Sequence, residues 1–424
     1  MKKNILKAFA GDMMYSIIAL VALNGTIQLL VNPILTKQMG AAAFGVILSI
    51  ESVVSIMASS FGSGANYSRL VMSARKEEPK GDYNLFLAII AAISLIVTLV
   101  MLIVFRALNP VMYVSSAVLM IASVLRYYGD VQYKLAINYK GFMKYYIVIA
   151  IGYAAGTLLY PVTHSWGIAI ALGEVLATVY VCLTGNLYKR PLFEASEYRA
   201  GVMRSVWQLS LAYLISSMIM NADRILIMLF VGSAEVTIFY TATLVGKIVA
   251  MITSPLNGVL MGHLSKYEGG LTKKMMSAIS GALFAVGLLV LAASVIASNI
   301  FVMIMYPDVY GQAKPLFLLA NAGQIFYFIS ESLMVIVLRF TGEKLQIILN
   351  AGYAVIFFAA AIPAVLFGGL HGLAAAIFAV NIVSRNVLQA AVTEQCGSSI
   401  RSDKEQLIIF KSRLRRNERD LCRL

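Results

Sequence analysis

Nine charged side chains fall inside membrane-length apolar stretches of this 424-residue chain. The set comprises four cations and five acids: Arg126, Arg224, Lys247 and Arg385, with Glu51, Asp130, Glu174, Asp223 and Glu331. Hydrocarbon makes each of them costly, by roughly 2.5–3.5 kcal/mol at a helix centre. We therefore expect these groups to surround a polar interior, as in membrane proteins that move a polar substrate or an ion.

The cations suit a phosphate-bearing substrate, because phosphate groups are bound by Lys and by the forked donors of Arg. Arg224 is expected toward the external end of its span, Lys247 near mid-depth, and Arg126 and Arg385 in the inner half. Such a ladder could pass an anionic head group across. Alternatively, Arg126 and Asp130, four residues apart on one helical face, neutralise each other. Arg385 is also close enough to the cytoplasm to extend its head group there.

The acids are candidates for coupling to a cation gradient. Glu51, Glu174 and Glu331 have no basic residue nearby in sequence. A carboxylate in hydrocarbon favours its neutral form, so it could bind and release a proton as its surroundings open. The alternative is a protonated or paired residue that only packs helices. Asp223 and Arg224 are adjacent and point about 100° apart, so each needs a different partner.

The composition indicates an all-α polytopic membrane protein. Hydrophobic residues make up 60% of the chain and charged residues 13%, against about 25% charged in soluble domains. Apolar windows of about 20 residues, the length of a membrane-spanning helix, recur throughout. We predict about twelve spans: 13–35, 44–66, 85–105, 113–133, 143–163, 167–187, 207–230, 236–260, 276–299, 315–338, 345–367 and 371–394.

The distribution of positive charge predicts that both termini are cytoplasmic. Most of the 34 Lys and Arg residues lie on the N-terminal side of the predicted spans. Outside the spans, only Lys37, Arg106 and Lys314 lie on the other side. This asymmetry orients membrane proteins. It also explains the net charge of +14 without a nucleic-acid partner, since no single phosphate-binding face is indicated.

The connections leave no room for a catalytic domain. External loops have about 15 residues or fewer, and the longest, 300–314, is expected to be a turn around Pro307. The chain lacks a phosphate-binding Walker motif. Its three cysteines lack metal-ligand spacing. We therefore expect neither an enzyme nor a metal site nor a bound cofactor, apart from H⁺ or Na⁺ coupling.

The chain is predicted to form two six-helix lobes, residues 1–200 and 201–394, followed by a basic cytoplasmic tail, 395–424. Residues 39–43 align weakly with residues 231–235, which suits a parallel repeat. Within the tail, residues 406–421 have apolar side chains at helical spacing. They form either an amphipathic helix on the inner membrane surface or a disordered basic segment.

Two segments resemble the polysaccharide transporter family, the Wzx-like O-antigen and exopolysaccharide flippases of the multidrug/oligosaccharidyl-lipid/polysaccharide (MOP) superfamily. Residues 32–40 (NPILTKQMG), followed by Phe44-Gly45, look like that family's first-loop pattern. Residues 221–227 (NADRILI), then Gly232 and Phe239-Tyr240, are similar to its seventh-span segment. The chain departs from the pattern just before the aromatic pair, where the family more often has a glycine.

The resemblance implies a MATE-like V-shaped fold with a central cavity that opens alternately to either side. It implies a bacterial cytoplasmic (inner) membrane location and an undecaprenyl-diphosphate-linked glycan as cargo, moved to the external leaflet. Membrane lipids, a polysaccharide polymerase and a chain-length regulator are the candidate partners. Two other functions stay open: a cation-coupled multidrug exporter of the same superfamily, and a membrane-embedded polysaccharide polymerase or ligase. The intramembrane cations disfavour the first and the short loops disfavour the second.

Overall fold

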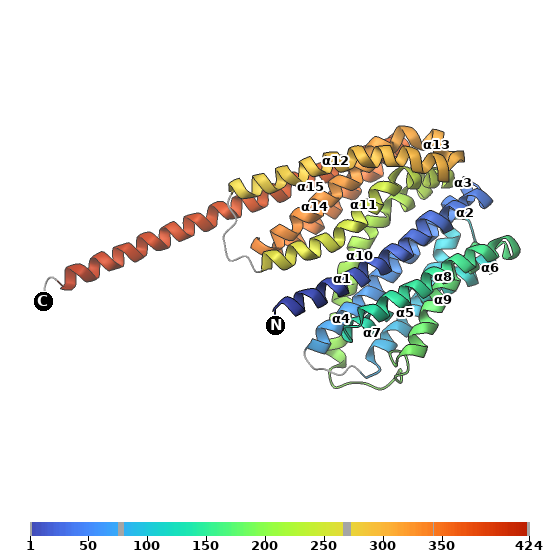
Figure 1. Cartoon of the computed structure of the whole chain (residues 1–424), viewed down its shortest axis with the longest axis horizontal. Coiled ribbons are helices and arrows are strands. Elements are labelled where there is room, and N and C mark those ends of the chain that lie inside the picture. The colour runs from blue at the N-terminus through green and yellow to red at the C-terminus, as the bar shows by residue number, and fades with distance from the viewer. Residues whose placement is uncertain (1, 75–79, 266–272, 342, 422–424) are drawn as a thin grey trace. The chain divides into compact units, whose positions relative to one another are not determined.

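The structure is a computed structural model of the whole chain (Figure 1). It describes the backbone of residues 2–74, 80–265, 273–341 and 343–421. Side chains are described for residues 11–73, 80–249, 257, 274–336, 348–388 and 390. Every regular element in these ranges is a helix, which confirms the predicted all-α class.

Ten helical segments in the described part of the chain are long and apolar enough to span a membrane. Nine of them cover predicted spans one to seven, nine and ten, and the tenth, Ile348–Leu388, covers the last two. That segment belongs to α15 (Glu343–Leu421), whose helix is broken at Gly369 with φ 55° and ψ −139°. The other predicted span, 236–260, lies on α11 (Ser233–Ser265), where many side chains lie outside the described residues.

The chain forms two compact units. Unit 1 comprises Met1–Thr241 and Phe301–Ala313, and unit 2 comprises Ala242–Ile300 and Lys314–Leu424. The predicted lobes, with their boundary at residue 200 and a tail from residue 395, stay a prediction.

Unit 1 contains all of the first seven predicted spans. Its helices are α1 (Lys2–Gly25), α2 (Asn32–Met39), α3 (Ala41–Met57), α4 (Ser63–Ala74), α5 (Asp82–Val104), α6 (Pro110–Gly129), α7 (Val131–Leu135), α8 (Tyr139–Thr163), α9 (Trp166–Thr184), α10 (Arg199–Phe230), α13 (Pro307–Ala313) and the start of α11. Two π-helical segments, η1 (Thr26–Val31) and η2 (Ala58–Gly62), join α1 to α2 and α3 to α4. Gly40 ends α2 at φ 80°, a conformation that a residue with a side chain rarely adopts.

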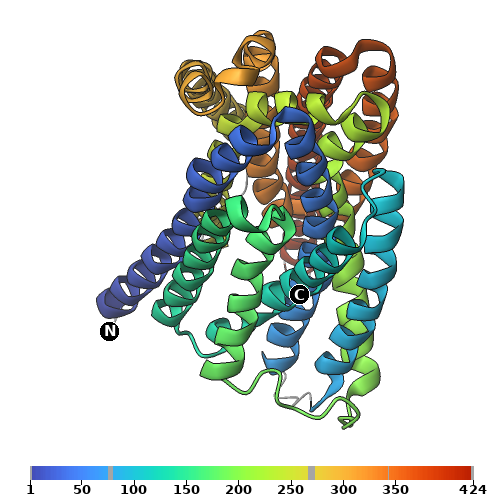
Figure 2. The same ribbon diagram turned by 90° about the vertical axis from the view of Figure 1, so that its right-hand side faces the viewer.

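Helix packing in unit 1 brings the charged spans together. Helix α8 lies against both α1 and α9, and α6 packs against α9 (Figures 1 and 2). Helix α10 packs along α3 and α4. Close approach depends on Gly64 of α4, because a Cβ there would lie 2.8 Å from the Cα of Ser210 in α10.

The segment between α9 and α10 is fastened to the start of α5 by buried polar side chains. Asp82, fully buried, accepts hydrogen bonds from Arg199 Nε at 2.9 Å and from the Ser196 hydroxyl. The Asn84 amide donates to the carbonyl oxygen of Arg190 at 2.8 Å. The connection between the sixth and seventh predicted spans is therefore held in place against α5, with Phe193 83% exposed at its surface.

Unit 2 is built on α14 (Phe317–Thr341), which packs against α15. It also contains most of α11, α12 (Lys273–Met305) up to Ile300, and the short 3₁₀ segment η3 (Lys314–Leu316). Its described core includes Met276, Ile325, Ile329, Leu333 and Leu388.

The structure also bears on two further predictions, the turn at 300–314 and the helix in the tail. The turn predicted around Pro307 is much shorter than 300–314, because α12 stays helical to Met305 and α13 begins with Pro307, leaving only Tyr306 between them. Proline is tolerated at the first position of a helix, where its missing N–H loses no hydrogen bond. In the tail, the backbone is helical as far as Leu421. This agrees with the helical alternative, whereas its place on a membrane surface stays a prediction.

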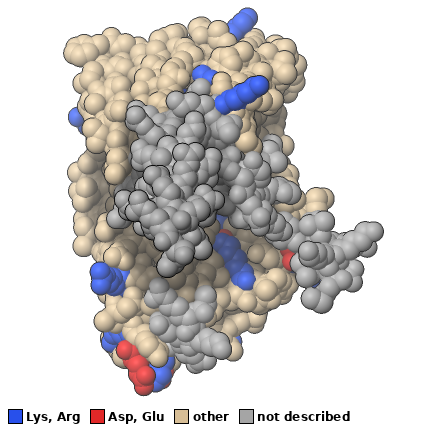
Figure 3. All heavy atoms as spheres, turned by 90° about the vertical axis from the view of Figure 1, so that its left-hand side faces the viewer, with Lys and Arg blue, Asp and Glu red and all other residues tan. Residues whose placement is uncertain are grey.

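Large apolar side chains are exposed along the predicted spans. Leu158, Val162, Leu289 and Phe367 are examples, each at least 73% exposed. Charged side chains are sparse on the described surface in Figure 3. Such a surface suits contact with lipid chains rather than water, so the chain is a multi-pass membrane protein.

The predicted orientation can be tested by cysteine labelling. In a chain whose cysteines at 182, 396 and 422 are replaced by serine, Phe193→Cys should react with a membrane-impermeant maleimide only after the cells are opened. Gln312→Cys, exposed on α13, should react in intact cells, because positive charge favours the cytoplasmic side. The reverse pattern would contradict the predicted orientation.

Candidate functional site

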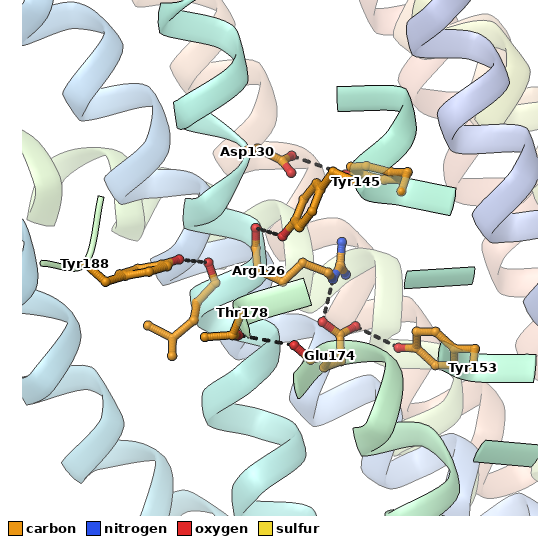
Figure 4. Close-up of polar contacts among 9 residues, drawn as sticks. Arg126, Asp130, Tyr145, Tyr153, Glu174, Thr178 and Tyr188 are labelled. Carbon is orange, nitrogen blue, oxygen red and sulfur yellow. Dashed lines mark hydrogen bonds and ion pairs between the residues drawn. The ribbon is translucent and has the colours of Figure 1, made fainter. Parts of the chain in front are cut away.

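A buried ion pair joins α6 to α9 in unit 1 (Figure 4). Arg126 Nε lies 2.6 Å from Glu174 Oε2, and the two residues are 8% and 1% exposed. The Tyr153 hydroxyl, from α8, donates to the other carboxylate oxygen at 2.7 Å. The guanidinium carbon also lies 4.2 Å from the centroid of the Tyr127 ring. Three helices are thus tied together through one neutralised pair, which we call the Arg126 cluster.

Asp130 has partners other than Arg126. Its Oδ2 accepts a hydrogen bond from the Tyr146 hydroxyl at 3.2 Å and lies 3.7 Å from Lys134 Nζ. The two groups on the same helical face that could have neutralised each other are therefore paired separately. The hydroxyl of Tyr145 donates to the Arg126 carbonyl oxygen at 3.3 Å, which holds this end of α6 against α8.

Tyr188, in the loop after α9, packs against α6 next to the Arg126 cluster (Figure 4). Its hydroxyl donates to the Leu125 carbonyl oxygen at 2.6 Å. Burial raises the pKa of this hydroxyl well above its ordinary value. It therefore stays protonated and remains a donor at any physiological pH.

A second polar cluster in unit 1 surrounds Arg224 of α10. Its guanidinium carbon lies 5.0 Å from the centroid of the Tyr240 ring, within range of a cation–π contact. The Tyr240 hydroxyl accepts a hydrogen bond from Asn32 Nδ2 at 2.7 Å and donates to Gln28 Oε1. Arg224 also interacts electrostatically with Glu51 of α3. We call these five residues the Arg224 cluster.

Arg224 keeps an unused donor. In the part of the chain that the structure describes, its Nε is buried without a hydrogen-bond partner. The neighbouring Asp223 accepts a hydrogen bond from the backbone N–H of Arg224 at 2.9 Å. Its carboxylate is thus turned to the helix backbone at this contact. A buried N–H without a partner costs free energy, which a bound acceptor would recover.

The two segments that carry the family resemblance meet at the Arg224 cluster. Asn32, in the first segment, bonds to Tyr240 in the second. The hydroxyl of Thr237 donates to the Ala41 carbonyl oxygen at 2.7 Å. A Cβ on Gly45 would lie 1.7 Å from the Ser233 carbonyl oxygen, so only glycine permits this approach. The motif residues therefore form the contact at which α2, α3 and the start of α11 pack together.

Unit 2 holds the remaining predicted cations. Arg385 of α15 donates from Nη2 to Ser280 Oγ at 3.3 Å, and its guanidinium carbon lies 4.7 Å from the Phe284 ring centroid. Its Nε is buried without a hydrogen-bond partner among the described residues. Lys247 lies on α11 and is partly buried.

Glu331 lines a cavity of about 250 Å³ between α14 and α15. Its other polar lining residues are Tyr327, Ser330, Asn350, Tyr353 and Ser384, and the remaining lining is mostly apolar. The Tyr327 side chain interacts with the Glu331 carboxylate. No Lys or Arg is among the lining residues that the structure describes, so the cavity is acidic.

The structure thus sorts the nine predicted residues. It joins Arg126 to Glu174 and Asp130 to Lys134, and brings Glu51 near Arg224. Asp223 accepts a hydrogen bond from the Arg224 backbone, and Glu331, Arg385 and Lys247 lie in unit 2. Sequence reasoning missed Tyr153, Tyr146 and Gln28 as partners. Nothing in the spacing of these residues marks them, whereas Asn32 and Tyr240 belong to the quoted motifs.

No known family model matches the chain, and no curated protein matches it. Solved structures do. A lipid II flippase, MurJ, in an inward closed conformation superposes with a TM-score of 0.70 at 13% identity, over 94% of this chain and 92% of that one. An inward-facing multidrug resistance MATE family transporter of the MOP superfamily has a TM-score of 0.58 at 13% identity, over 91% and 95%. An outward-facing structure of such a transporter gives 0.57 at 16%, over 92% and 96%. The chain therefore has the fold of these proteins.

The Arg126–Glu174 pair should be a major stabilising contact of unit 1. Glu174→Gln leaves a buried guanidinium uncompensated, and breaking such a pair costs about 3–5 kcal/mol. We expect a clearly lower unfolding temperature in detergent, measured by a thiol-reactive or scattering assay. Lys80→Ala, which breaks the exposed Lys80–Glu194 pair, is the control and should change little. Equal stability of both variants would show that the buried pair is not stabilising.

Proposed function

We propose that the chain is a transporter that moves an undecaprenyl-diphosphate-linked oligosaccharide from the cytoplasmic to the external leaflet by alternating access. The observation that carries this proposal is the partly buried Arg224, whose Nε is a buried donor without a hydrogen-bond partner among the described residues, in a chain with the fold of a lipid II flippase. The glycan would be an O-antigen or a related surface polysaccharide unit.

A diphosphate suits the Arg224 cluster for a physical reason. Guanidinium presents paired N–H donors in a plane that matches two phosphate oxygens. The Tyr240 ring, held by Asn32 and Gln28, keeps the guanidinium in place before any ligand arrives. A preordered side chain loses less conformational entropy on binding. The cluster therefore supplies a positioned anion contact within the membrane.

The role of Arg126 in the proposal differs from that of Arg224. Its charge is already neutralised by Glu174 at 2.6 Å, and separating a buried pair is costly. Arg126 would therefore hold α6, α8 and α9 as one body, while Arg224 contacts the cargo. Lys247 and Arg385 remain proposed contacts for the anionic head group from unit 2.

Coupling to a proton gradient is proposed for two carboxylates. A diphosphate at Arg224 would compete with Glu51, and protonation of Glu51 would remove the repulsion between the two anions. Glu331 has no basic residue among the described residues of its cavity, so a proton is the simplest countercharge there. The inner membrane of a bacterium, with both termini in the cytoplasm, is the proposed location, and a polysaccharide polymerase and chain-length regulator are proposed partners.

One observation favours a second candidate function, the export of cationic compounds. The Glu331 cavity is acidic and mostly apolar, and two tyrosine rings in it, Tyr327 and Tyr353, lie 6.4 Å apart between centroids. Such a cavity suits an organic cation. The two functions differ in the residue they need. Loss of cation export in Glu331→Gln, with no lipid transport by the intact protein, would favour the exporter.

Arg224→Ala should strongly impair transport of the lipid-linked cargo. A hydrogen bond to a charged group contributes about 1.5–3 kcal/mol, which corresponds to roughly a 10- to 150-fold loss of rate if it is made in the transition state. The measurement is the transfer of fluorescent undecaprenyl-diphosphate sugar between leaflets of proteoliposomes. Arg204→Ala removes an exposed arginine from the same helix and should keep full transport. Undiminished transport by Arg224→Ala would refute the phosphate contact.

Glu331→Gln tests the coupling proposal. If Glu331 carries a proton during the cycle, the variant should lose the acceleration that an imposed pH gradient gives to the intact protein. Its transport without a gradient should persist, because the fold and Arg224 are intact. Glu197→Gln, exposed in the loop before α10, is the control. A gradient response equal to that of the intact protein would exclude Glu331 as the coupling residue.

A further inference from the structure

The tyrosines at the inner ends of the predicted spans differ in what they do. Tyr128 and Tyr145 are fully buried and Tyr146 is 5% exposed, so these rings belong to the core. Tyr67 of α4 is 44% exposed and lies one residue past the predicted span 44–66, on the helical segment Ala41–Ser73 that is long and apolar enough to cross a membrane. An exposed ring at this depth is available to a ligand.

Tyr67 belongs to a small aromatic and charged group within unit 1. Its ring stacks on that of Tyr213 from α10, with centroids 5.4 Å apart and planes inclined by 23°. The Lys134 ammonium lies 5.4 Å from the Tyr67 ring centroid and 3.7 Å from Asp130 Oδ2. Two stacked rings thus stand beside an ammonium and a carboxylate that already balance each other.

The helix face beside Tyr213 carries small and polar side chains around the level of that tyrosine. At about 100° per residue, α10 divides into three faces. The first, with Val206, Ser210 and Ser217, is buried. The second exposes large apolar residues: Trp207, Leu211, Ile215 and Met218. The third exposes small or polar residues over about two turns, Gln208, Ala212 and Ser216, with the apolar Met220 exposed beyond them.

Tyr213 lies at the boundary between the buried face and this small, polar face. Side chains in lipid contact are typically large and apolar, as on the second face, whereas an amide and a hydroxyl prefer water or a polar ligand. The Tyr67–Tyr213 stack therefore borders a surface suited to a hydrated group.

We propose that Tyr67 and Tyr213 form a stacking platform for a sugar ring of the transported head group. One face of a pyranose presents C–H groups, which are attracted to the negative face of an aromatic ring. Its hydroxyl groups can accept hydrogen bonds from the Lys134 ammonium, which is partly exposed. A phosphate would find little net charge here, because the ammonium is already paired. This inference rests on the proposed function and adds a glycan contact distinct from the diphosphate contact at Arg224.

The test is a comparison of lipids with and without a sugar. The protein in lipid nanodiscs is titrated with undecaprenyl diphosphate and with the same lipid carrying glucose, galactose or N-acetylglucosamine. At least one sugar should tighten binding to the intact protein by about fivefold, a range expected for an aromatic contact. Tyr67→Ala should abolish this gain while leaving the affinity for undecaprenyl diphosphate unchanged. Tyr67→Phe, which keeps the ring, should retain it.

Two matched variants separate the alternatives. Arg224→Ala should weaken binding of all four lipids. Tyr198→Ala, which removes a tyrosine of similar exposure (47%) from the loop before α10, should change none. Absence of any sugar-dependent gain, or its persistence in Tyr67→Ala, would overturn the platform while the diphosphate contact stands. If none of the four lipids binds the intact protein, the proposed function fails, and the platform fails with it.

Discussion

The poor solvation of charge in hydrocarbon is the constraint on which this structure depends. A soluble protein can leave an unpaired carboxylate in water, whereas a membrane span must pair it, neutralise it or place it beside a polar space. Arg126 and Glu174 show the first outcome, with a 2.6 Å contact and a tyrosine on the remaining oxygen. The helices α6, α8 and α9 are arranged around that contact, because each supplies one of the three groups.

Arg224 shows a different outcome of the same constraint. It is near Glu51 and above the Tyr240 ring, yet its Nε is left without a partner in the described part of the chain. The guanidinium of Arg126 is paired with a carboxylate, and the same fold could have provided such a partner for Arg224. The unpartnered Nε of Arg224, like that of Arg385, is therefore a feature that points to a ligand. The proposed ladder of cations would then lack Arg126, because the charge of Arg126 is already balanced by Glu174.

Glycine and tyrosine make these arrangements possible. Gly45 and Gly64 let helix backbones approach where any side chain would collide, and small residues are the usual means of close helix packing in membranes. Tyrosine supplies an apolar ring with one hydroxyl, so it can be buried against a helix and still satisfy a charged group. Tyr153 and Tyr146 do this for carboxylates, whereas Tyr67 leaves its ring accessible.

The sequence by itself determined the helical class, nearly all of the span positions and the identity of the intramembrane charges, because membrane thickness and the cost of burying charge leave a local record in the chain. It also indicated Asn32 and Tyr240 through the motifs that contain them. Only the tertiary structure decided which charges are paired. Helical periodicity relates residues three or four positions apart, whereas Arg126 and Glu174 are separated by 48 positions and Asn32 and Tyr240 by 208. The same limit explains why Tyr67 could not be told from the buried tyrosines: exposure of a ring depends on the neighbouring helix, and that neighbour is chosen by the fold.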